Sequence, residues 1–183
     1  MVSDPKSHIV VDDGRRYLLR VNKTFDVIAI DPPPPIEAAA SSLLYTTEFY
    51  QVAKKHLAPD GILQQWFPGG DDKAQDAVER SLRQAFPHVV AFRSIGPWGY
   101  HYLASISPIR DLTPAEFVAA LPPLARRDLM EWNPELTIEQ MAQNILSGRV
   151  ALESLLSPKG TEMVTDDRPY NEYYFLRRRH LIK

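Results

Sequence analysis

Residues 26–35 read Asp26-Val27-Ile28-Ala29-Ile30-Asp31-Pro32-Pro33-Pro34-Pro35, and this stretch decides the fold of the chain. Its apolar, largely β-branched run at 27–30 is typical of a strand buried in a parallel sheet. The run ends in the carboxylate of Asp31, and the four prolines that follow make helical continuation unfavourable. Because open α/β sheets bind ligands just outside the carboxyl ends of their strands, Asp31 lies where such a fold carries its chemistry.

The composition describes a globular chain without a strong charge bias. Its 183 residues fit one domain, or one domain with a small appendage, and 44% hydrophobic residues supply a core. The net charge of −2 disfavours nucleic-acid binding, and the lack of cysteine excludes disulfides and a thiol nucleophile. The histidines lack metal-ligand spacing, so no metal site is expected. Without a signal peptide or an apolar run of ~20 residues, we expect a soluble, cytoplasmic protein without a membrane span.

Short apolar runs alternate with amphipathic segments from residue 8 to residue 107, which predicts a βα-type sheet. The expected strands cover 8–11, 26–30, 62–67, 88–95 and 100–107, and the expected helices cover 15–19, 42–57 and 71–86. The last two strands flank Gly96-Pro97-Trp98-Gly99 and should form an antiparallel pair.

From Asp111 onward the pattern indicates helices only. Thr113 and Thr137 each open a capping-box sequence. Further on, Asp166-Asp167-Arg168 is either a second acidic patch for an amine or a structural tie between this tail and the sheet. The chain is therefore divided into a partial Rossmann-like domain, residues 8–107, and a helical C-terminal extension, residues 108–183, that packs on it.

The order of motifs across residues 8–92 resembles the spermidine synthases, which are polyamine aminopropyltransferases. The matching segments are Val11-Asp12-Asp13-Gly14-Arg15, Phe25-Asp26-Val27-Ile28, Asp31 with its prolines, Leu44-Tyr45-Thr46-Thr47-Glu48-Phe49-Tyr50-Gln51 and Asp60-Gly61-Ile62-Leu63. The closing run from Thr165 to Tyr173 is similar to a bacterial subset of this family, in which the synthase-like domain often follows a membrane-spanning region. Association with a membrane is expected only if the parent protein carries such a region.

The resemblance implies a Rossmann-like sheet of the S-adenosylmethionine-dependent methyltransferase type. It implies aminopropyl transfer from decarboxylated S-adenosylmethionine to a small-molecule amine, with this cosubstrate (or S-adenosylmethionine) in place of a permanently bound cofactor. By position, Asp31 matches the carboxylate that orients the attacking amine or takes its proton. Asp13 matches the residue that contacts the adenine amino group, and Gly14 allows close approach there. Tyr45 lies near the family's substrate pocket, with core packing as an equal alternative.

Two residue positions depart from the family pattern. The second aspartate of the family, three residues after the first, is Pro34 here, which weakens the case for a doubly charged diamine. The glutamine of the following strand falls on Trp66 when Gly61 is aligned. Gln64 shares a face with Trp66 and is a substrate-binding candidate if a bulge intervenes, whereas Gln65 points to the opposite face.

The family's glycine-rich cosubstrate loop has no counterpart, because the sequence contains no G-x-G-x-x-G. In the methyltransferase-type strand order 3-2-1-4-5-7-6, residues 8–11 match strand 3 and residues 26–30 match strand 4. The first two strands are then missing, and the exposed sheet edge invites homo-oligomer formation. We therefore expect this chain to be a C-terminal portion of a larger, spermidine synthase-like protein and to be incomplete as an enzyme by itself.

Two other functions fit the same residues. One is a non-catalytic synthase-like module that binds a ligand or partner through its sheet edge. The other is an S-adenosylmethionine-dependent methyltransferase, since carboxylates followed by prolines also end the corresponding strand there.

Overall fold

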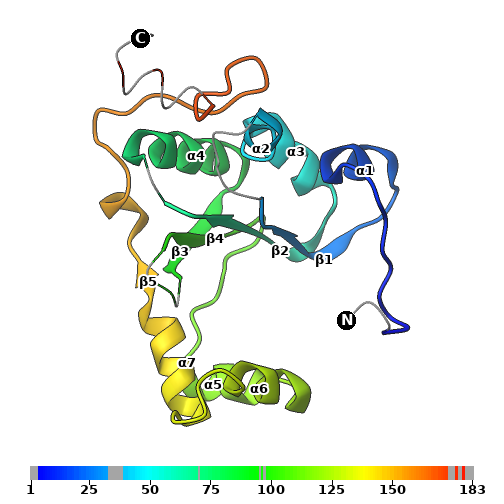
Figure 1. Ribbon diagram of the computed structural model, residues 1–183, viewed down its shortest axis with the longest axis vertical. Helices are drawn as coiled ribbons and strands as arrows, with labels where there is room; N and C mark the ends of the chain where they lie inside the picture. Colours follow the sequence, from blue (N-terminus) through cyan, green and yellow to red (C-terminus); the bar gives the residue numbers. More distant parts are fainter. Residues whose placement is uncertain are drawn as a thin grey trace.

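The computed structural model describes residues 4–32, 39–69, 71–94, 96, 98–172, 176 and 179. A five-stranded sheet in the order β1-β2-β4-β3-β5 crosses the molecule (Figure 1). The strands are β1 (Phe25–Ile30), β2 (Leu57–Phe67), β3 (His88–Arg93), β4 (Tyr100–Ser105) and β5 (Arg149–Val150). Only β1 and β2 pair in parallel among these strands, and the other three pairings are antiparallel. In the expected methyltransferase-type numbering, the first four strands of this order correspond to strands 4-5-7-6.

Helices cover one face of the sheet and close the core. They are α1 (Gly14–Arg20), α2 (Ala39–Ser42), α3 (Thr47–Lys55) and α4 (Asp72–Ala85). Alternate residues of β2 point to this face, so Leu63, Gln65 and Phe67 are fully buried. They pack with residues of α3 and α4 such as Phe49 and Leu82. This alternation leaves the neighbouring side chains of β2, including Gln64 and Trp66, on the other face.

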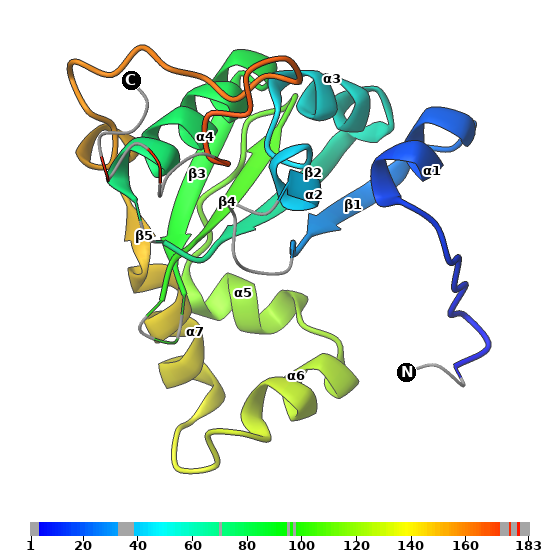
Figure 2. The same cartoon turned by 45° about the horizontal axis from the view of Figure 1, so that its top comes forward.

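Three C-terminal helices lie on the side of the sheet opposite α3 and α4 (Figures 1 and 2). They are α5 (Pro114–Ala120), α6 (Pro123–Met130) and α7 (Ile138–Ser147), followed by the 3-10 helix η1 (Leu152–Ser154). Both expected capping boxes are present: Thr113 pairs reciprocally with Glu116, and Thr137 with Gln140. Each cap satisfies backbone N–H groups that the first helical turn leaves unpaired.

Three expectations about secondary structure are wrong. Residues 8–11 form no strand and run as an exposed segment, with Val11 99% exposed, because no strand in the described part of the chain offers them a hydrogen-bonding partner. The helix expected at 42–57 is divided, since the Thr46 side chain caps α3 by accepting from the backbone N–H of Phe49. The helices-only pattern after Asp111 fails at β5, which pairs with Ala91 and Phe92 of β3.

Candidate active site

Asp31 directly follows β1, and its side chain lines a cavity of about 230 Å³ together with Gln64, Trp66 and His101. Strand register brings these residues together, because Ile30 pairs with Gln65 and Trp66 pairs with His101. The cavity therefore lies beyond the carboxyl end of the first strand, where the sequence placed the chemistry. Prolines 33–35, including the Pro34 that replaces the second aspartate, lie outside the described residues.

The side chains of Gln64 and His101 are hydrogen-bonded to each other in this cavity. Gln64 Nε2 lies 2.9 Å from His101 Nδ1, and an amide nitrogen can only donate, so Nδ1 accepts and the ring proton is placed on Nε2. Burial lowers the pKa of His101, against an opposing effect of the Asp31 charge. A neutral imidazole leaves Asp31 as the charged side chain among the four that line this cavity at pH 7.

Gln65 and Tyr45 lie on the core side of the sheet. Gln65 is fully buried and accepts a hydrogen bond from the Tyr50 hydroxyl at 3.3 Å, while its amide donates to the Trp66 carbonyl at 3.0 Å. Tyr45 is also fully buried and packs edge-to-face on Phe67, with ring centroids 6.1 Å apart. Gln65 therefore points away from Asp31 as expected, whereas Tyr45 is a core residue and is not among those lining the cavity.

Asp13 and Gly14 begin α1, away from the lining of the Asp31 cavity. Asp13 Oδ1 accepts from the backbone N–H of Arg16 at 2.7 Å, which makes Asp13 the N-cap of the helix. A Cβ at Gly14 would meet no heavy atom within 4 Å, so packing does not require glycine and the space beside it is open. Next to them, Asp12 pairs with Arg16 and Arg20, and the hydrogen bond from Arg16 is the main cause that lowers the pKa of Asp12.

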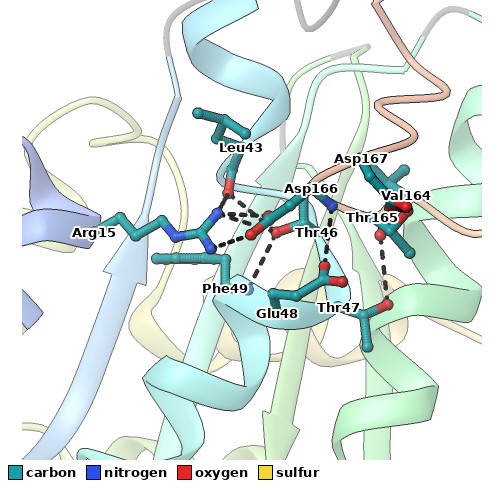
Figure 3. Close-up of polar contacts among 10 residues, drawn as sticks. All are labelled: Arg15, Leu43, Thr46, Thr47, Glu48, Phe49, Val164, Thr165, Asp166 and Asp167. Atoms are coloured by element: carbon teal, nitrogen blue, oxygen red, sulfur yellow. Dashed lines mark hydrogen bonds and ion pairs between the residues drawn. The ribbon is translucent and has the colours of Figure 1, made fainter. Parts of the chain in front are cut away.

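A polar cluster joins α1 to the C-terminal segment (Figure 3). Arg15 donates to both carboxylate oxygens of Asp166, at 2.7 and 2.5 Å. The Asp166 backbone N–H donates to Glu48 of α3 at 3.1 Å. The hydrogen bond from Arg15 lowers the pKa of Asp166. Of the two interpretations of Asp166, the structure therefore shows the structural tie, with the carboxylate already occupied by an arginine.

Asp166→Asn is expected to destabilise the protein by about 1 kcal/mol, because it removes a charged, bidentate partner of Arg15 that is only partly exposed. Urea denaturation of the wild type, Asp166→Asn, Arg15→Gln and the double variant measures this. The coupling energy from that cycle should be about 0.5–1 kcal/mol. Asp167→Asn is the matched control, since among the described residues Asp167 accepts from Thr165 of the same turn and forms no ion pair. A coupling energy of zero would refute the tie.

The sequence of this chain is similar to a known protein family. A profile of the spermine/spermidine synthase domain matches residues 1–96, which is more than half of the chain. This chain belongs to the spermine/spermidine synthase family. As a member of that family it is 32% identical over 105 residues to polyamine aminopropyltransferase 2 of Pseudomonas aeruginosa, a match covering 53% of this chain and 30% of that protein. The chain spans about a third of the length of the curated relatives it matches.

Solved structures support the Rossmann-like, methyltransferase-type fold of this family member. A spermidine synthase in complex with the transition-state analogue AdoDATO is 25% identical, with a TM-score of 0.50, covering 69% of this chain and 52% of that one. Human methyltransferase-like protein 13 in complex with SAH superimposes with a TM-score of 0.51 over 85% of this chain and 62% of its own, at 18% identity. The second likeness concerns the fold alone.

The described part of this synthase-family chain contains no group of three side chains suited to a metal. Nor does any helix described here have the length and apolar character needed to cross a membrane.

His101 and Trp66 line the cavity but were not predicted as site residues, although the strand pattern of the sequence contained the information needed to place them. Alternation along β2 puts Trp66 on the same face as Gln64. His101 lies on β4, which pairs with β3 as the predicted antiparallel hairpin and with β2 next to Trp66.

Proposed function

We propose that this chain forms the amine-binding side of an aminopropyltransferase that uses decarboxylated S-adenosylmethionine. The observation that carries the proposal is the cavity at the end of β1, where Asp31 lies with Gln64, Trp66 and His101 in a member of the spermine/spermidine synthase family. Asp31 is exposed at this cavity, and such a carboxylate attracts an ammonium group and can accept its proton. A small-molecule amine is thus the substrate, and the protein acts as a transferase in polyamine biosynthesis.

The proposed reaction is a single displacement. The amine arrives protonated beside Asp31 and loses one proton, because an ammonium nitrogen has no electron pair with which to attack. Its nitrogen then forms a bond to the aminopropyl carbon attached to the sulfonium sulfur, and the electrons of the breaking C–S bond remain on sulfur. Methylthioadenosine leaves, and a carboxylate such as Asp31 receives the proton.

In this proposal Asp13 and Gly14 receive the adenine of the cosubstrate. Capping uses one oxygen of Asp13, and a carboxylate has a second oxygen to accept from an adenine amino group. The open space at Gly14 fits the close approach of a planar ring. Gln64 orients the amine through its amide, and Tyr45 supports the pocket from the core by its contact with Phe67.

Decarboxylated S-adenosylmethionine is expected to bind this chain alone with low affinity, because no glycine-rich loop occurs in the sequence to hold the ribose and the aminopropyl tail. Isothermal titration calorimetry with the cosubstrate and with methylthioadenosine should give dissociation constants in the high micromolar range or weaker. Tight, stoichiometric binding would contradict this part of the proposal. Buffer injections and Asp13→Ala serve as controls, since the variant should abolish any residual signal from adenine.

We also propose a domain boundary, a cellular location and a mode of association for this protein. The division at residues 107 and 108, the cytoplasmic location and the association of copies through the β1 edge rest on the sequence pattern. In an activity assay, turnover of S-adenosylmethionine in place of its decarboxylated form would favour a methyltransferase. Failure to turn over either compound with any amine would favour a non-catalytic module.

A further inference from the structure

The Asp31 cavity continues into a larger one. A cavity of about 900 Å³ lies between the open face of β2, β3 and β4 and the C-terminal helices, and it shares Gln64 and His101 with the Asp31 cavity. Its apolar lining comes from both sides, with Ile62, Val90, Phe92 and Leu103 from the sheet and Phe117 and Ile145 from α5 and α7. A molecule held by an ammonium at Asp31 therefore has an apolar space next to its other end.

The charged groups around the larger cavity are mostly positive. Arg93, Arg110 and Arg149 line it, whereas Asp111 is the single acidic residue among the described residues of the lining and is ion-paired with Arg149. Arg110 lies 3.5 Å from Glu116, and Arg93 is exposed. Because Arg149 and Arg110 each face a carboxylate, the lining arginine without an ion pair among the described residues is Arg93. A second ammonium at the far end of a diamine would meet this like charge, which disfavours binding.

We propose that the amine acceptor of this site is a primary monoamine with an apolar chain, which places its ammonium at Asp31 and its chain in the larger cavity. This inference rests on the proposed aminopropyl transfer and names the class of its acceptor. Apolar burial would make each added methylene worth about a fourfold gain in affinity until the cavity is filled. The product would be the corresponding N-alkyl-1,3-diaminopropane, formed by the displacement described above.

Three six-carbon ligands test the inference on the full chain. In isothermal titration calorimetry, n-hexylamine is expected to bind at least tenfold more tightly than 1,6-diaminohexane and 6-aminohexanoate at equal ionic strength. From n-butylamine to n-hexylamine the affinity should rise about fourfold per methylene. Equal affinity for monoamine and diamine, or a preference for the diamine, overturns the proposal. A preference for 6-aminohexanoate overturns it too, because the arginines would then recognise an anion.

Substitutions in the lining of the larger cavity test whether the amine chain binds there. Leu103→Asp should reverse the preference toward 1,6-diaminohexane, and Leu124→Asp on α6 is the control because Leu124 is exposed and outside the lining. If Leu103→Asp fails to fold by circular dichroism, Arg93→Gln replaces it and should raise diamine affinity at least threefold. An unchanged selectivity in the folded variant overturns the proposal.

Asp31→Asn separates the failure of this inference from the failure of the proposed function. If both amines bind equally and the variant weakens both, the acceptor class is wrong and the amine site of the transferase stands. If the variant still prefers n-hexylamine to 1,6-diaminohexane but binds n-hexylamine as tightly as the wild type does, the proposed binding of the apolar chain is supported and the proposed role of Asp31 is wrong.

Discussion

Asp31→Asn is expected to lower the rate of aminopropyl transfer by a factor of about 10² to 10⁴, because the variant keeps the size of the side chain but can neither attract an ammonium nor accept its proton. The assay is the release of methylthioadenosine from saturating decarboxylated S-adenosylmethionine, measured by liquid chromatography. The loss should appear in kcat as well as in the KM for the amine, since the carboxylate acts in both binding and proton transfer.

Asp26→Asn is the matched control for this experiment. Asp26 lies on β1, the strand that precedes Asp31, is exposed and is not among the residues that line the cavity. Its substitution should leave the rate within twofold of the wild type. An Asp31→Asn variant with an unchanged rate would remove Asp31 from the mechanism and, with it, the main support for the proposed function.

Glu79→Gln is expected to make the protein more stable than the wild type at pH 8.5 and to bring it within about 1 kcal/mol of the wild type at pH 5. The carboxyl group of Glu79 is fully buried on α4 and makes no hydrogen bond within the described part of the chain. Burial, helped by the charge of Asp76, raises its pKa from 4.5 to about 8. In the folded protein the group is therefore neutral over a range where the unfolded chain carries the charge.

The sign of the pH effect follows from these two pKa values. The unfolded chain gives up the proton near pH 4.5 and the folded protein near pH 8, so stability declines as the pH rises through this window. A shift of this size corresponds to roughly 5 kcal/mol at most. Glutamine keeps the shape of the protonated acid and removes the dependence. Urea denaturation at pH 5 and pH 8.5 measures the effect.

Glu139→Gln is the control for the pH experiment, because Glu139 is an exposed carboxylate in the first turn of α7. It should not change the difference in stability between the two pH values. A wild type that is equally stable at pH 5 and pH 8.5 would show that Glu79 finds a partner or solvent when it ionises.

Local patterns in the sequence predicted the elements whose causes are local. The apolar run ending in Asp31 predicted the position of β1 but not its burial, because β1 is an edge strand and Val27 is 61% exposed. The two-residue alternation of Gln64 and Trp66 predicted the correct face of β2. The threonine caps of α5 and α7 were predicted from four residues each. Elements whose position is determined by side chains within one helical turn or one strand can be predicted from the sequence in this way.

Expectations failed where distant residues decide the outcome. Residues 8–11 have the composition of a strand, but a strand forms only when a neighbour offers it hydrogen bonds, and none does in the described structure. Thr46 interrupts the helix expected at 42–57 where Arg15 and the segment near Asp166 meet α3. The placement of His101 beside Asp31 required the register of β2 on β4, which composition does not encode.

The Arg15–Asp166 ion pair joins side chains 151 positions apart, so during synthesis it forms only after most of the chain has been made. At ribosomal rates of about 5–20 residues per second, Asp166 is added roughly 8 to 30 s after Arg15. Throughout that interval α1 can dock on α3 without its bidentate anchor. Until Asp166 is synthesised, α1 and the candidate adenine contact at its start therefore lack the ion pair to the C-terminal segment.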